Sequence, residues 1–116
     1  MELRDARDVS IHGVKGEYSQ PIIWIRDCDH IRVFGYGGNA AAAEGKSLFV
    51  VERTPKFLLA NLVDSPRMPQ GIPDTFFAGD GVDPTRWCMV RDTPARGGSI
   101  MTQPLERPVL YQRGTP

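Results

Sequence analysis

With 116 residues, 14 acidic and 14 basic side chains and a hydrophobic content of 41%, the chain has the size of one domain and no formal net charge. This balance excludes the basic field that attracts a nucleic-acid backbone, so we expect no nucleic-acid partner. No apolar run approaches the roughly 18 residues that a membrane-spanning helix requires, so we expect no membrane partner. Twelve glycines and ten prolines favour short strands joined by turns over a helical bundle.

A repeat begins at the N-terminus and predicts paired strands. Residues 3–14 (LRDARDVSIHGV), 25–36 (IRDCDHIRVFGY) and 51–62 (VERTPKFLLANL) match in register, with steps of 22 and 26 residues. The match gives three apolar columns: Leu3, Ile25 and Val51; Val9, Ile31 and Phe57; Ile11, Val33 and Leu59. The last two columns are two residues apart in each repeat and therefore share one face of a strand. Gly13, Gly35 and Asn61 occupy the next turn position and tolerate a left-handed backbone, which predicts a corner.

The strand that precedes each match also repeats. Residues 21–27 (PIIWIRD), 47–53 (SLFVVER), 86–92 (RWCMVRD) and 108–114 (PVLYQRG) align with one another. A strand–turn–strand unit of about 22 residues cannot bury its apolar face alone, whereas stacked units form a continuous core. The connections leave no room for the helices of about 10–15 residues that a βαβ arrangement requires. The pattern therefore predicts an all-β fold of stacked parallel coils.

This repeat, most clearly in residues 25–36, resembles the pectin-lyase-like family of right-handed parallel β-helices. The resemblance covers residues 2–63 well and 86–114 loosely. It implies a right-handed parallel β-helix (solenoid) of about five coils. It implies no single activity, because such folds occur in polysaccharide lyases, glycoside hydrolases, phage tailspikes and adhesins. It favours a secreted or periplasmic location, although residues 1–8 lack the apolar core of a signal peptide.

The chain begins within a coil, because Leu3 enters an apolar column with no cap before it. Open strand edges are normally covered. We therefore expect residues 1–116 to form a single β-helix segment, the C-terminal part of a larger protein. The alternative is that a neighbouring chain covers this end.

A long insertion at 64–84, with four prolines and three glycines, interrupts the repeat. Insertions in a solenoid project from one face, which is often the binding face, and the alternative is a passive cover. The insertion contains four aspartates, Asp64, Asp74, Asp80 and Asp83. They make a calcium ion possible, although Asp80 and Gly81 together are more simply a turn signal. No other cofactor is expected.

An arginine column is the first candidate site. The position after the inward column holds Arg4, Arg26, Glu52, Arg91 and Arg113. These side chains are expected to face outward on strands about 4.8 Å apart and to form a ladder for the carboxylate or sulfate groups of an acidic polysaccharide. The alternative is an ion-paired, solvated face, in which Glu52 relieves the repulsion between arginines.

An apolar strip occupies the other outward positions of the same strands. It consists of Ile22, Trp24, Leu48, Val50, Trp87, Met89, Val109 and Tyr111. A solvent-facing strand would carry polar residues there, so we expect this sheet to be covered on both faces. The insertion, another subunit, or a sugar stacked on Trp24 and Tyr111 could provide the cover. The strip and the uncapped end together predict self-association.

The leading hypothesis is a β-helix segment of a carbohydrate-active protein, a polysaccharide lyase or glycoside hydrolase, that binds an acidic glycan. The predicted substrate-binding residues are Arg4, Arg26, Arg91, Arg113, Trp24 and Tyr111. No residue is assigned to catalysis. The alternative is a non-catalytic structural or assembly module, similar to a tailspike or adhesin stalk.

Overall fold

The computed structural model describes residues 1–17, 21–39, 46–64, 87–98, 100–101 and 109–114. These residues form strands β1 (Glu2–Arg4), β2 (Arg7–Glu17), β3 (Ile23–Arg26), β4 (Asp29–Asn39), β5 (Lys46–Glu52), β6 (Phe57–Asp64), β7 (Trp87–Thr93), β8 (Ile100–Met101) and β9 (Val109–Arg113). They contain no helix, and so none that could cross a membrane. The all-β prediction is confirmed for the described part of the chain.

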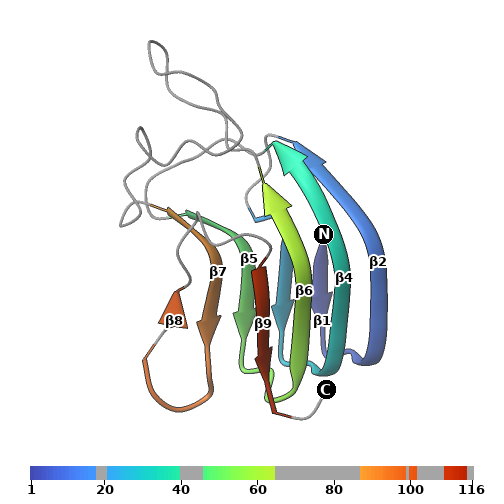
Figure 1. Ribbon diagram of the computed structural model, residues 1–116. Coiled ribbons are helices and arrows are strands. Elements are labelled where there is room, and N and C mark those ends of the chain that lie inside the picture. Colours follow the sequence, from blue (N-terminus) through green and yellow to red (C-terminus); the bar gives the residue numbers. More distant parts are fainter. Residues whose placement is uncertain (18–20, 40–45, 65–86, 99, 102–108, 115–116) are drawn as a thin grey trace.

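The strands form two sheets that lie face to face (Figure 1). One sheet has the order β1-β3-β5-β7-β8 and the other the order β2-β4-β6-β9. From β1 to β6 the chain alternates between the sheets, and strands within each sheet pair in parallel. Each step along the chain therefore adds one strand to each sheet, as the repeat predicts.

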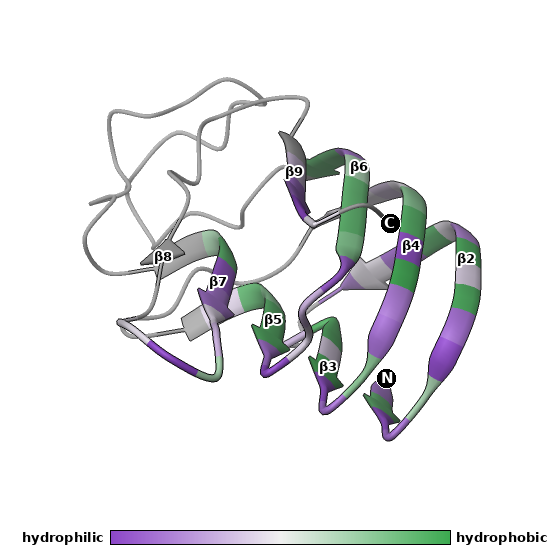
Figure 2. Cartoon of the chain, turned by 90° about the horizontal axis from the view of Figure 1, so that it is seen from below, coloured by the Kyte–Doolittle hydropathy of each residue, from purple (hydrophilic) through white to green (hydrophobic). Residues whose placement is uncertain are grey.

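The apolar columns of the repeat lie at the predicted register. Leu3 pairs with Ile25 and Ile25 with Val51, while Val9, Ile31 and Phe57 form the corresponding row of the second sheet. Ile25, Val51, Ile31 and Phe57 are fully buried in one core between the sheets, whereas Leu3 and Val9 of the first repeat are only partly buried. Seen from below in Figure 2, apolar segments alternate with hydrophilic turns along the stack.

Left-handed residues form the corners of each repeat. Gly13, Gly35 and Asn61 have φ angles of 67°, 82° and 59°, which confirms the predicted left-handed column, although these residues lie within β2, β4 and β6 and not between strands. A second column was not predicted: Asp5 and Asp27 have φ angles of 53° and 55° in the turns after β1 and β3. Aspartate and asparagine tolerate a left-handed backbone better than most residues, so these two aspartates are suited to the turn positions that they occupy.

A ladder of side-chain hydrogen bonds links successive turns. The Ala6 N–H donates to Cys28 Sγ at 3.4 Å, and the Cys28 N–H donates to Thr54 Oγ1 at 3.3 Å. The Cys28 thiol in turn donates to the Arg26 carbonyl, and the Thr54 hydroxyl donates to the Glu52 carbonyl. Cys28 and Thr54 are buried, and the bond between the Cys28 N–H and Thr54 satisfies a backbone donor that lies in the interior.

The stack differs from the prediction after β6. Residues 86–92 align two residues away from the predicted register, because Val51 pairs with Asp92 and Val50 with Arg91. The match of residues 108–114 with this strand is wrong: β9 pairs antiparallel with β6, in the other sheet. β8 also returns antiparallel, on β7. The described residues form three two-strand repeats followed by β7, in place of the expected five coils.

The physical reason is that an alternating apolar pattern has the same period of two in parallel and antiparallel strands. A slip of two residues likewise keeps every side chain on its face, so the pattern cannot detect it. The described strands form two sheets and not a closed coil, so the right-handed β-helix stays a prediction. Residues 65–84 of the predicted insertion lie outside the described residues.

The first sheet is covered on both faces at one end, as predicted. Ile23, Phe49 and Val90 face the core. Their outward neighbours Leu48 and Met89 are also fully buried within the single chain. This half of the apolar strip therefore needs no second subunit to cover it.

Candidate functional site

The site is built on the outward side of β1, β3, β5 and β7, near the turns. Because Ile25 and Val51 point into the core, the residues on either side of each point outward. We call the resulting surface the outer face; it consists of Glu2, Arg4, Trp24, Arg26, Val50, Glu52, Arg91 and Thr93. Glu2, Trp24, Val50 and Arg91 form one row across the sheet, and Arg4, Arg26, Glu52 and Thr93 form the next.

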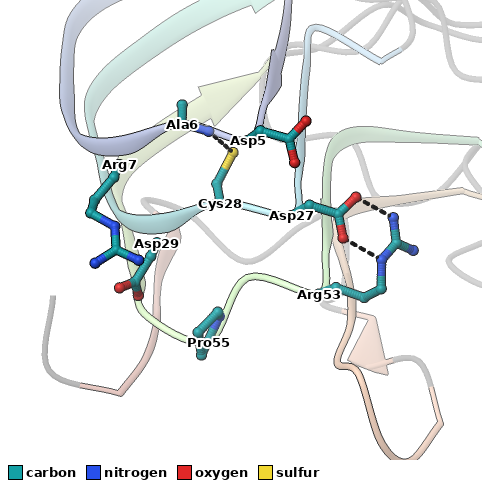
Figure 3. A pocket seen from close by; sticks show the side chains of 8 residues that line it. All are labelled: Asp5, Ala6, Arg7, Asp27, Cys28, Asp29, Arg53 and Pro55. Carbon is teal, nitrogen blue, oxygen red and sulfur yellow. Dashed lines mark hydrogen bonds and ion pairs between the residues drawn. The ribbon is translucent and has the colours of Figure 1, made fainter.

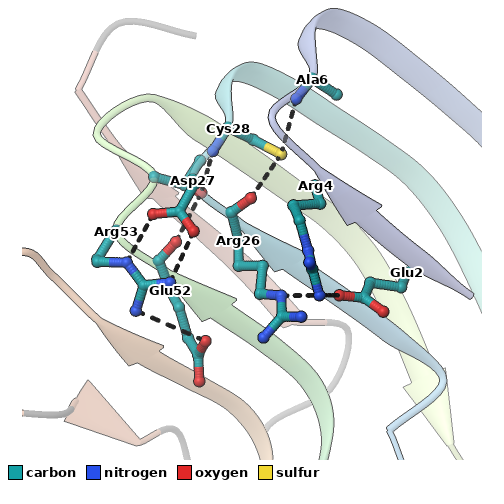
Figure 4. A network of polar contacts seen from close by, with 9 residues as sticks. Glu2, Arg4, Ala6, Arg26, Asp27, Cys28, Glu52 and Arg53 are labelled. Carbon is teal, nitrogen blue, oxygen red and sulfur yellow. Dashed lines mark hydrogen bonds and ion pairs between the residues drawn. The ribbon is translucent and has the colours of Figure 1, made fainter.

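Arg26 is at the centre of the outer face. Its guanidinium carbon lies 4.4 Å from the centre of the Trp24 ring, a cation–π arrangement. Arg26 Nε lies 2.7 Å from Glu2 Oε1, and Arg4 donates to the same oxygen at 3.1 Å (Figure 4). One carboxylate thus serves two guanidinium groups. The Arg26 side chain is 22% exposed, so its charge is only partly screened by water.

Two donors of this face lack a hydrogen-bond acceptor among the described residues. They are Nε1 of Trp24 and Nε of Arg26, both shielded from solvent. Arg26 Nε is close to Glu2 but is not aligned with it for a hydrogen bond. Buried donors without acceptors are rare in proteins. Trp24 Nε1 is the clearer candidate for an unused donor, since Arg26 Nε already faces Glu2 Oε1 at 2.7 Å.

The predicted arginine ladder is rearranged. Arg4 and Arg26 are neighbours in one row, as expected, and Glu52 follows them. Thr93, and not Arg91, continues this row, so the prediction that Arg91 stacks on Glu52 is wrong. Arg91 lies two residues further back, in the Trp24 row, but still on the outer face. Four of the six predicted residues, Arg4, Arg26, Arg91 and Trp24, are therefore on one surface.

Tyr111 and Arg113 are not on the outer face. They belong to β9, and Tyr111 pairs with the inward residue Leu59, while its ring stacks on Phe57 at 5.7 Å between centres. The Tyr111 hydroxyl donates to Asp92 Oδ2 at 3.0 Å, and Arg113 donates to the same oxygen. The placement of both residues in the outer column is wrong, because β9 runs in the opposite direction in the other sheet.

Asp92 is a buried carboxylate whose charge is balanced by Arg113 and whose Oδ2 also accepts a hydrogen bond from Tyr111. The sequence match places it beside the arginine column, but its side chain is inward and fully buried. A buried carboxylate must be paired, and Tyr111 and Arg113 supply the donors. Burial also raises the pKa of the Tyr111 hydroxyl, which keeps it protonated as a donor. A polar clamp thus joins β7 of one sheet to β9 of the other.

The turns hold a second group of charges, shown in Figure 3. Arg53 binds both carboxylate oxygens of Asp27, at 2.6 and 2.7 Å. The hydrogen bonds from Arg53 lower the pKa of Asp27, and burial raises the pKa of the Cys28 thiol. These residues line an open pocket of about 460 Å³ with Asp5, Ala6, Arg7, Asp29 and Pro55.

Sequence reasoning missed the pair of Asp27 and Arg53, although the repeat contains its signal. The two residues occupy the same turn column in successive repeats, with opposite charges. Adjacent rungs place such residues side by side. A search for charge reversal within columns would have found the pair.

The possibility of calcium stays a prediction. Among the residues that the structure describes, no three His, Cys, Asp or Glu side chains are grouped to hold a metal ion. Asp74, Asp80 and Asp83 of the predicted insertion lie outside these residues. Comparison with known proteins gives no match to a family model, a curated sequence or a solved structure.

Proposed function

We propose that this chain is a right-handed parallel β-helix module of a carbohydrate-active protein, and that its outer face binds an acidic glycan. The β-helix is supported by six strands that alternate between two parallel sheets at steps of 22 and 26 residues. The left-handed residues at both sets of turns add to this support. Polysaccharide lyase or glycoside hydrolase activity is the reaction class that the family resemblance favours.

The observation that carries the binding proposal is the Arg26 guanidinium over the Trp24 ring. An aromatic ring offers an apolar surface to the C–H groups of a sugar, and an arginine binds a carboxylate or sulfate through two parallel hydrogen bonds. Arg4 and Arg91 add positive charge to the same face. A ligand carboxylate would replace Glu2, which is the exposed partner of Arg26.

The test is a binding titration with polygalacturonate and alginate, and with dextran as an uncharged control. We expect saturable binding of an acidic polymer and none of dextran. Arg26→Gln should weaken binding about tenfold, the loss of roughly one charge-assisted hydrogen bond. Lys15→Gln makes the same charge change on the other sheet, at a side chain that is 76% exposed, and should leave affinity unchanged.

The reaction class is tested in the same samples. Release of an unsaturated product or of new reducing ends would assign a lyase or a hydrolase, respectively. Equal affinity for dextran and the acidic polymers, or equal losses in Arg26→Gln and Lys15→Gln, would contradict the binding proposal.

A non-catalytic assembly module is the second candidate, and the open edge of the stack favours it. β1 and β2 are edge strands, and Leu3, Val9 and Ile11 are only partly buried there. Such edges readily pair with another chain. Sedimentation over a concentration series should then show association, and a strict monomer would count against this candidate.

A further inference from the structure

A basic pocket lies at the turn edge, where three segments meet. Its walls come from the turn after β5, the turn after β7 and the end of β9. Arg53, Arg96 and Arg113 line it, together with Pro55 and Pro94, around a volume of about 380 Å³. No carboxylate is among the described residues that line this pocket. Three arginines thus line one space that is large enough for a small ligand.

Two of the three arginines are held by carboxylates of neighbouring segments. Asp27 holds Arg53 through Nε and one terminal nitrogen. The buried Asp92 holds Arg113 through one terminal nitrogen, and the Arg113 guanidinium lies 5.7 Å from the centre of the Phe57 ring. A guanidinium has five N–H donors, so each of these arginines keeps donors for a ligand. Anchoring lowers the entropy cost of binding, because the donors are already positioned.

Close packing holds the β9 wall of the pocket in place. Gly114 has a φ of 66° directly after Arg113. A Cβ at this position would lie 2.8 Å from the Pro55 carbonyl oxygen and 2.9 Å from Lys56 Cγ. Glycine therefore allows the end of β9 to lie against the turn after β5. This contact keeps Arg113 on the same side as Arg53.

Arg96 is the arginine available to a ligand. It lies in an exposed turn, and it has no hydrogen bond or ion pair within the described part of the chain. Asp27 and Asp92 already balance the charges of Arg53 and Arg113, so Arg96 brings the positive charge that has no counter-ion within the described part of the chain. An oxyanion in the pocket would pair with Arg96 and accept further hydrogen bonds from the remaining donors of the other two arginines.

We propose that this pocket is a binding site for a compact oxyanion: a phosphate, a sulfate, or the carboxylate or sulfate group of a sugar. The site shares no residue with the outer face. This site and the glycan-binding proposal can therefore be tested independently.

The experiment is a titration of the full chain with inorganic phosphate at constant ionic strength, followed by the arginine Nε–Hε NMR signals. We expect saturable shifts of three arginine signals, assigned by single glutamine variants. Arg96→Gln should weaken phosphate binding about tenfold while leaving the fold intact, because its side chain is exposed. Arg113→Gln is not used for affinity, since it would leave Asp92 buried without its cation.

Lys15→Gln is the matched control and should bind phosphate as the wild type does. Sulfate and oligogalacturonate titrations distinguish the source: tighter binding of the sugar acid assigns a glycan group, and tighter binding of the inorganic ions assigns a free anion. Absence of saturable shifts with all three ligands would overturn the site. Equal weakening by Lys15→Gln and Arg96→Gln would also overturn it, because only general charge would then matter.

Discussion

Thr54 offers a quantitative test of the hydrogen-bond ladder between the turns. Its side chain is almost fully buried, its hydroxyl donates to the Glu52 carbonyl at 3.0 Å, and it accepts the Cys28 N–H at 3.3 Å. Thr54→Val retains the shape but removes both bonds. The Glu52 carbonyl still accepts the Asp27 N–H at 3.0 Å. The Cys28 N–H alone is left without a partner.

An unsatisfied buried donor costs about 1–3 kcal/mol, against a total stability of roughly 5–15 kcal/mol. With a urea dependence of about 1–3 kcal/mol per molar, the unfolding midpoint should fall by about 1 M. Hydrogen exchange gives the local readout: the Cys28 amide should exchange faster in Thr54→Val, whereas the Asp27 amide keeps its protection. An unchanged midpoint together with unchanged exchange at Cys28 would refute the ladder.

Three further changes test the clamp, a turn and the core. Tyr111→Phe should destabilise the chain by about 1–3 kcal/mol in urea unfolding, because the buried Asp92 loses a donor, and wild-type stability would contradict this. Arg53 lowers the pKa of Asp27 in the folded state. The ion pair therefore contributes to the free energy of unfolding at pH values above the usual pKa of 3.8, and this contribution is lost as the pH falls through the lowered pKa. The stability gap between the wild type and Asp27→Asn should therefore close on acidification, and a constant gap would argue against the pair. Ile31→Asp should abolish cooperative unfolding, since a buried charge costs several kcal/mol; a folded variant would show that this position is not in the core.

The sequence predicted the first six strands because two independent signals agree there. Apolar columns specify which side of each strand is buried, and Gly13, Gly35 and Asn61 specify where each coil turns. Together these signals determine both face and register. In residues 86–92 the match depended on apolar alternation and on Arg91 and Asp92 repeating Arg26 and Asp27, and it was wrong by a slip of two residues.

The direction of β9 could not be predicted, for a similar reason. Its apolar alternation fits either direction, and the contacts that select the antiparallel one are long-range. They join Arg113 and Tyr111 to Asp92 across the core. A buried ion pair between two strands has no local sequence signature, because its partners are 19 and 21 residues apart. The candidate site was predicted where strand alternation was sufficient, at Arg4, Arg26 and Trp24.

The most direct test of glycan binding by the outer face is the indole N–H signal of Trp24 in an NMR titration with an oligogalacturonate. Trp24→Phe assigns this signal, since the chain has two tryptophans. Trp24 Nε1 has no acceptor among the residues that the structure describes, so a bound acidic sugar should shift its resonance in a saturable way. The shift should be reduced in Arg26→Gln and retained in Lys15→Gln. An unchanged Trp24 resonance at saturating ligand would show that the glycan does not bind at the outer face.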